Sequence, residues 1–345
     1  MSSARWRTST STTETNAMRW RKAAAAGGAA IGAAALYNVT ASHRIAVLDN
    51  PLGGESLEMD WRGHRVAYTR HGAGTPVLLV HGIYAGASSY EWRNTVDALA
   101  ARHTVYAVDL LGFGRSARPN VRYTPAMYQA FLADFMARLG HGPLAVVATS
   151  LSAAHVVALA ARDPRHIAAL ALIGPAGVGQ LRESSSTGQA ASQLLLDAPI
   201  VGTAIYNALT SPVSVREFLE EVYANDRLVT DELVEDYVQN ARQPGAKHAV
   251  AAFVGGRLNL DIRNALRRVR HPMLILWGDQ ARMNSVQNAH AFRVLKPEAE
   301  WALISEAGDL PHDEKPRQTN EALLRFLERL RKPTPRGTTP TIAGA

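Results

Sequence analysis

The chain has 345 residues, of which 47% are apolar, so it can bury a sizeable core as one large α/β domain or two ordinary ones. It contains no cysteine, which excludes disulfides, thiolate metal sites and cysteine nucleophiles. The formal net charge of +7 lies at the two ends, because residues 1–43 carry +4 and residues 331–345 carry +3. The body between them is neutral, so a basic groove for nucleic acid is not indicated.

Residues 1–45 are expected to form a disordered basic tail followed by an Ala/Gly-rich apolar segment. The apolar segment, residues 23–39, has no charge and follows Arg19, Arg21 and Lys22, which is the layout of an export signal or a membrane anchor. It is shorter than the ~20 residues that span a bilayer comfortably. Two interpretations stay open: a membrane-associated or exported protein that contacts lipid through this segment, and a cytoplasmic protein with a loose Ala-rich extension.

From residue 46 to residue 174 the pattern alternates between strands and helices. A linker at residues 46–54 precedes a hairpin, with strands at 57–61 and 64–69 on either side of Arg62-Gly63. Further on, continuous apolar runs predict buried parallel strands, and stretches with helical spacing separate them. These strands are 77–81, 104–108, 144–148 and 167–173, and the helices are 92–101, 124–139 and 152–161.

Residues 175–270 have helical spacing and no strand pattern. Strands resume at 273–277 and 301–304, with helices at 285–295 and 320–330 and a Pro/Thr/Gly-rich tail, residues 331–345, that is expected to be disordered. Strands that alternate with helices predict a doubly wound, mostly parallel α/β sheet. Residues 46–174 and 271–330 would form its core, and residues 175–270 a helical cap inserted between two late strands.

Ser150 lies where the strand 144–148 meets the helix 152–161, with almost no loop between them. Such a junction forces its residue into a strained backbone state and pushes the side chain out at the top of the sheet. This is the geometry of a nucleophile elbow, G-x-S-x-G. Here the sequence is Ala148-Thr149-Ser150-Leu151-Ser152, in which small residues replace both glycines. A helix N-cap is the other interpretation of Ser150.

Three separated stretches together resemble the α/β-hydrolase fold family: His81-Gly82 after one buried strand, Asp109–Ser116 after the next, and Ser150 at the elbow. The resemblance covers residues 57–330, and the helical span resembles the cap of lidded members such as esterases, epoxide hydrolases and cofactor-free haloperoxidases. It implies that Ser150 attacks an acyl carbon while the backbone N–H groups of Ile83 and Leu151 hold the oxyanion. A serine at the elbow excludes the branches whose nucleophile is an aspartate.

The sequence departs from this family where the base and the acid of the triad are expected. In Trp277-Gly278-Asp279-Gln280-Ala281 the usual acid position is Ala281, and in Ala307-Gly308-Asp309-Leu310-Pro311-His312 the usual histidine position is Asp309. Asp279 and His312 lie in the same two loops. The sequence therefore predicts a rearranged triad of Ser150, His312 as base and Asp279 as acid, with Asp309 as the alternative acid.

The leading hypothesis is a serine hydrolase of the carboxylesterase or lipase type that acts on a small apolar ester-like substrate. The alternatives are a catalytically degenerate member that binds an apolar ligand or a partner, motivated by Ala281 and Asp309, and a lyase-type enzyme on the same fold. His81 is expected to brace the oxyanion loop, and His155 to be a core histidine behind the elbow. The sequence shows no metal-ligand spacing, phosphate loop or dinucleotide fingerprint, so no metal and no cofactor is expected.

Overall fold

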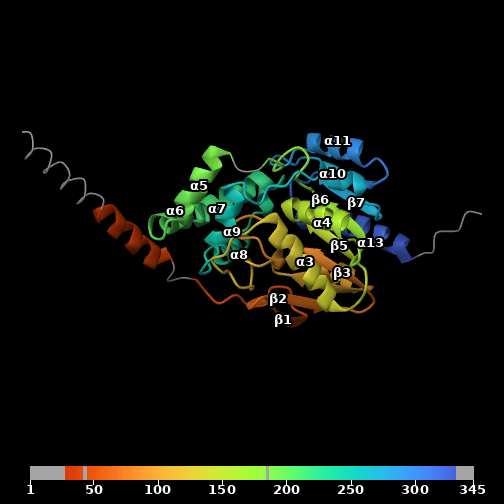
Figure 1. Ribbon diagram of the computed structural model, residues 1–345, viewed down its shortest axis with the longest axis horizontal. Helices are drawn as coiled ribbons and strands as arrows, with labels where there is room; N and C mark the ends of the chain where they lie inside the picture. Colours follow the sequence, from red (N-terminus) through yellow and green to blue (C-terminus); the bar gives the residue numbers. More distant parts are fainter. Residues whose placement is uncertain (1–27, 42–44, 184–185, 332–345) are drawn as a thin grey trace, which may run out of the picture.

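The computed structural model describes residues 28–41, 45–183 and 186–331. Its centre is one eight-stranded sheet in the order β1-β2-β4-β3-β5-β6-β7-β8, in which β2 is antiparallel to both its neighbours and every other pair is parallel (Figure 1). The strands are β1 (Glu55–Trp61), β2 (His64–His71), β3 (Thr75–Val80), β4 (His103–Val108), β5 (Leu144–Thr149), β6 (Ile167–Ile173), β7 (Met273–Gly278) and β8 (Glu300–Ile304). The predicted doubly wound, mostly parallel sheet is confirmed.

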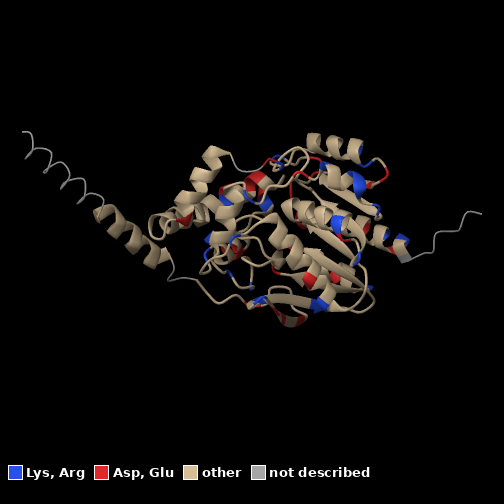
Figure 2. Cartoon of the chain, viewed as in Figure 1, with Lys and Arg blue, Asp and Glu red and all other residues tan. Residues whose placement is uncertain are grey.

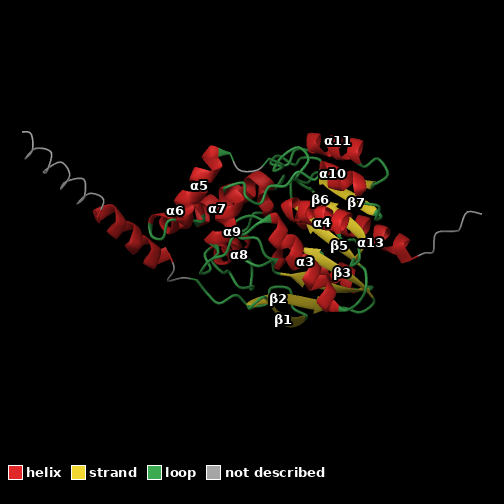
Figure 3. Ribbon diagram, viewed as in Figure 1, coloured by secondary structure: helices red, strands yellow, loops and turns green. Residues whose placement is uncertain are grey.

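Helices cover both faces of the sheet (Figure 3). Leu78 and Val80 of β3 point into the cluster with α3 and α4, whereas Val77 and Leu79 point into the cluster with α2 and α13, as the period of two in a strand requires. This is why the central strands read as unbroken apolar runs. The helices are α2 (Val96–Ala100), α3 (Pro125–Leu139), α4 (Ser150–Arg162), α10 (Arg263–Arg268), α11 (Val286–Leu295), α12 (Pro311–Glu314) and α13 (Pro316–Arg331), and the short 3-10 helix η1 spans Ser89–Trp92.

The chain between β6 and β7 forms helices and no strand among the described residues. Before α10, its longer helices are α5 (Thr187–Asp197), α6 (Val201–Leu209), α7 (Pro212–Val222), α8 (Asp231–Ala241) and α9 (Lys247–Val254). A third apolar cluster joins α7 and α8 to Leu310, just before α12, with Tyr84 and Phe218 packed against it. These inserted helices therefore contact the loops that follow the carboxyl ends of the parallel strands. Their role as a cap over a substrate site stays a prediction.

A helix at residues 28–41 precedes the linker to β1 and contacts the inserted helices (Figure 1). Asn38 Nδ2 donates to Ile200 O at 3.0 Å, and Ala46 N donates to Gln239 Oε1 at 2.9 Å. Within the described residues, no helix is both long enough and apolar enough to cross a bilayer. Arg331, the first residue of the tail expected to be disordered, is the last residue of α13. The rest of that tail, residues 332–345, and the first residues of the chain lie outside the described ranges.

Candidate active site

Ser150 is the first residue of α4 and follows directly on β5, which ends at Thr149. Its φ of 49° lies in the left-handed region, which a residue with a Cβ adopts at an energetic cost. The helix starts at Ser150, two residues earlier than the apolar pattern predicts, so no loop separates the strand from the helix. Small residues on both sides allow this approach: Ala148 is buried, and the Ser152 hydroxyl donates to His81 O at 2.6 Å.

Of the two predicted oxyanion donors, Leu151 directly follows Ser150 and Ile83 lies in the loop after β3. Leu151 lies in the first turn of α4, where backbone amides have no acceptor within the helix. Ile83 follows β3 in the loop that begins with His81-Gly82, and its side chain lines the same cavity as Ser150. His81 braces this loop as the sequence predicts, because its Nδ1 lies 2.7 Å from Gly82 O and its Nε2 accepts from Leu110 N at 3.0 Å.

The buried side chain of Glu91, in η1, joins the loop after β3, which we call the oxyanion loop (residues 81–84), to the elbow at Thr149-Ser150. Its Oε2 accepts from Gly82 N at 3.0 Å and from the Tyr84 hydroxyl at 2.6 Å, and its Oε1 accepts from the Thr149 hydroxyl at 2.6 Å. Burial alone would raise the pKa of this carboxyl, but His312 and the hydrogen bonds lower it to about 2. The sequence gives no signal for this role, because Thr149 and His312, which are distant in the chain, come next to Glu91 only through tertiary packing.

The cavity at Ser150 has a volume of about 160 Å³, comparable to engineered apolar cavities that hold benzene. Its walls come from the loop after β3, from the start of α4, from α7 and α9, and from the loops after β6, β7 and β8. They are Ile83, Tyr84, Ser150, Gly174, Gln180, Leu181, Phe218, Val222, Phe253, Met283, Asn284, Asp309 and Leu310. The lining contains no Lys, Arg or His, so an apolar uncharged molecule fits it best.

Asp309 occupies the position where the resemblance leads one to expect a histidine, and it lines the cavity with Ser150. Its Oδ2 accepts from the amides of Arg282 and Met283, each at 3.0 Å, and its Oδ1 accepts from the amide of Asn284 at 2.7 Å. Burial raises the pKa of the Asp309 carboxyl, and the three amides oppose that rise. Ala281, at the usual acid position, is buried.

His312 is fully buried and does not line this cavity. Its Nε2 lies 3.3 Å from Glu91 Oε1, and its ring centroid lies 4.9 Å from that of Trp92. The physical reason is that Pro311 opens the short helix α12, whose residues Pro311–Glu314 are all buried. His312 is thus directed into the core beside Glu91.

Asp279 also lies outside the cavity lining, and its Oδ1 is 3.4 Å from the amide of Ala307. The described contacts join His312 to Glu91 and Asp279 to the loop after β8. They do not bring either residue to Ser150 in the way a rearranged triad requires. The assignment of His312 and Asp279 as base and acid therefore stays a prediction that these contacts do not support.

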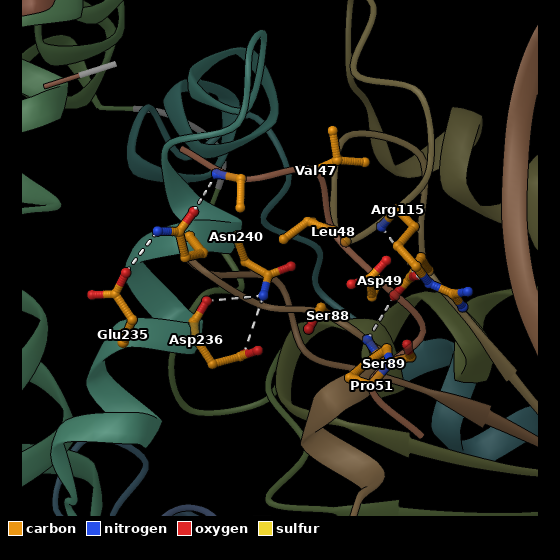
Figure 4. Close-up of a pocket in the computed structure, with 14 residues that line it drawn as sticks. Val47, Leu48, Asp49, Pro51, Ser88, Ser89, Arg115, Glu235, Asp236 and Asn240 are labelled. Atoms are coloured by element: carbon orange, nitrogen blue, oxygen red, sulfur yellow. Dashed lines mark hydrogen bonds and ion pairs between the residues drawn. The ribbon is translucent and has the colours of Figure 1, made fainter. Parts of the chain in front are cut away.

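A second cavity, of about 250 Å³, shares no lining residue with the first (Figure 4). It lies between the linker of residues 46–51, α8 and the loop that holds Arg115. Asp236 lines this cavity, and burial raises the pKa of its carboxyl to about 7, although Arg93 and Asn240 oppose the rise. Among the described residues no cluster of three or more His, Asp or Glu side chains could hold a metal ion.

Comparison with known proteins identifies the family of this chain and several relatives. The family model described as the α/β hydrolase fold matches residues 75–316. A dihydrolipoyllysine-residue acetyltransferase component of the acetoin cleaving system from Cupriavidus necator is 28% identical over 78% of this chain and 68% of its own length. A 2-hydroxy-6-oxo-6-(2'-aminophenyl)hexa-2,4-dienoic acid hydrolase from Metapseudomonas resinovorans is 28% identical over 77% of this chain and 89% of its own.

Among solved structures, a serine hydrolase involved in carbazole degradation is similar to this chain with a TM-score of 0.67. The sequence identity is 24%, and the match covers 80% of this chain and all of the other. At that identity the likeness concerns the fold.

Proposed function

Because the chain belongs to the α/β-hydrolase fold family, we propose that it is a serine hydrolase acting on an ester or related acyl bond of an apolar substrate. The observation that carries the proposal is Ser150, held at a φ of 49° in the wall of an apolar cavity. Backbone strain of this kind persists only where the surrounding structure enforces it, and it concentrates at functional sites. The amides of Ile83 and Leu151 would stabilise the oxyanion that forms when Ser150 Oγ bonds to the carbonyl carbon.

The serine proton needs an acceptor, and the carboxylate of Asp309 is the basic group of this cavity. A carboxylate offers about four lone-pair sites, and the three amides occupy three of them. The remaining site would take the Ser150 proton during attack and return it to the leaving alcohol, after which water would release the acyl group. A carboxylate is a weaker base than imidazole, so a slower reaction than in a complete triad is expected.

The cavity walls narrow the substrate class. The relatives of this protein include a hydrolase named for an oxo-dienoic acid. In this chain, however, the cavity lining has no cation to pair with a substrate carboxylate. The volume of about 160 Å³ suits one small acyl or alcohol portion. A neutral short-chain or aromatic ester is therefore the substrate class that we propose.

A second function, binding of an apolar carbonyl compound without turnover, is favoured by one specific observation. Both oxygens of Asp309 already accept backbone amides, and Ala281 leaves the usual acid position without a carboxylate. Such a protein would keep the cavity and the oxyanion amides but would transfer no acyl group.

Labelling with a fluorophosphonate probe, together with hydrolysis of neutral p-nitrophenyl esters, separates the two functions. The proposed hydrolase labels at Ser150 and releases nitrophenol, and Ser150→Ala abolishes both. Asp309→Asn should lose turnover while His312→Gln retains it, provided that circular dichroism shows each variant folded. A folded wild-type protein that neither labels nor turns over any ester would overturn the hydrolase and leave the binding function.

A further inference from the structure

The N-terminal helix, α5 and α6 carry large apolar side chains that are exposed and that line neither cavity. On α5, Leu194 is 75% exposed, and Leu209, at the end of α6, is 59% exposed. Leu36 and Val39 of the helix at residues 28–41 are also exposed. We call this surface, formed by residues 28–41 and 187–210, the apolar edge.

The apolar edge is nearly free of charge, although 19% of the whole chain is charged. Residues 28–41 contain no charged side chain, and residues 187–210 contain one, Asp197. In Figure 2 the N-terminal helix and the helices α5 and α6 are accordingly almost entirely tan, whereas blue and red segments are spread over the rest of the protein. Exposed apolar side chains that gather on adjacent, nearly uncharged helices are typical of a binding surface.

Hydrogen bonds join the parts of the edge into one surface. Asn38 Nδ2 donates to Ile200 O, and Asn207 Nδ2 of α6 donates to Asn38 Oδ1, each at 3.0 Å. At Gly202 a Cβ would overlap the carbonyl oxygen of Leu195, so α6 packs directly onto α5. The N-terminal helix, α5 and α6 therefore lie side by side, and each of them carries exposed apolar side chains.

We propose that the apolar edge docks on the surface of a lipid bilayer. Apolar side chains that enter the boundary between headgroups and acyl chains need no hydrogen-bond partner, which suits a surface of Leu, Val, Ile and Ala. In the sequence, Arg19, Arg21 and Lys22 precede the N-terminal helix, and a basic segment close in sequence to an apolar helix favours anionic headgroups. This docking is independent of the chemistry at Ser150.

Flotation of the full chain with lipid vesicles tests the proposal, using phosphatidylcholine vesicles with and without phosphatidylglycerol. The edge variant is Leu194→Lys with Leu209→Lys. The matched control is Val294→Lys with Leu303→Lys, whose side chains are 67% and 60% exposed on α11 and β8. Wild type and control should float with the anionic vesicles, and the edge variant should lose at least about tenfold in lipid-bound fraction.

Added salt should weaken binding to the anionic vesicles only, because it screens the basic residues and leaves apolar contacts unchanged. Thermal melts establish that both double variants fold. The proposal is overturned if wild type does not float, or if the edge variant floats as well as wild type. It is also overturned if light scattering shows a dimer that the edge variant dissociates and no vesicle binds, because the edge would then pair with a second copy.

Discussion

Replacement of Glu91 by Gln is expected to disturb both stability and the oxyanion loop, although the side chain keeps its shape. The carboxylate accepts from Gly82 N, the Tyr84 hydroxyl and the Thr149 hydroxyl, and it contacts His312 Nε2 at 3.3 Å. An amide has one acceptor oxygen, so one side of this network would face an N–H₂ group. Charge-assisted hydrogen bonds contribute about 1.5–3 kcal/mol each, and a loss of about 2–3 kcal/mol is expected for Glu91→Gln.

The lowered pKa of Glu91 gives a similar value for its contribution to stability. The folded-state pKa of Glu91, about 2, lies below its ordinary value of 4.5, so the carboxylate contributes stability at neutral pH. The fall corresponds to about 3 kcal/mol, present above pH 4.5 and lost as the pH falls toward 2. Glu91→Gln should therefore be less stable than wild type at pH 7, and the difference should shrink as the pH falls.

Urea unfolding between pH 7 and pH 3 measures this difference directly. Glu300→Gln is the control, because its partner Arg329 is exposed and such pairs contribute at most about 1 kcal/mol. Displacement of Gly82 should also misplace the Ile83 amide, and loss of one oxyanion donor costs about 10²–10³ in rate. An unfolding free energy equal to wild type at pH 7, or a difference that does not change with pH, would refute this account of Glu91.

Three further outcomes are expected. Asp309→Asn should abolish ester turnover at every pH, whereas in wild type turnover should rise with pH through the raised pKa of Asp309, measured as a pH–rate profile. The free energy of unfolding of Ser150→Gly should be about 1 kcal/mol higher than that of Ser150→Ala, because glycine adopts the φ of 49° without strain. Equal free energies of unfolding in urea melts would contradict that strain. Asp236→Asn should stabilise the protein by up to about 4 kcal/mol at pH 8 and have little effect at pH 4. The reason is that the folded-state pKa of Asp236, about 7, lies above its ordinary value of 3.8, so wild type loses stability as the pH rises between the two.

The elbow and the sheet could be predicted from the sequence because both depend on short-range pattern. Unbroken apolar runs identify strands buried on two faces, and the change of period at Ser150 identifies the junction. The surroundings of His312 depend instead on where Pro311 starts α12 and on a carboxylate more than two hundred residues away, at Glu91. Spacing from the elbow carries no information about either, so the rearranged triad was the natural but unsupported expectation.

The aspartate at position 309 and the alanine at position 281 are physically linked. The amides of Arg282, Met283 and Asn284 precede α11 and need acceptors, which the Asp309 carboxylate supplies. A neutral imidazole has one acceptor nitrogen and could satisfy only one of the three, so this loop conformation requires the carboxylate. With no imidazole at position 309, a carboxylate at position 281 would have nothing to orient and would be a buried charge without a partner. The apolar Ala281 is therefore the residue that this loop tolerates, and in the proposed hydrolase Asp309 would be the only acceptor in the cavity for the Ser150 proton.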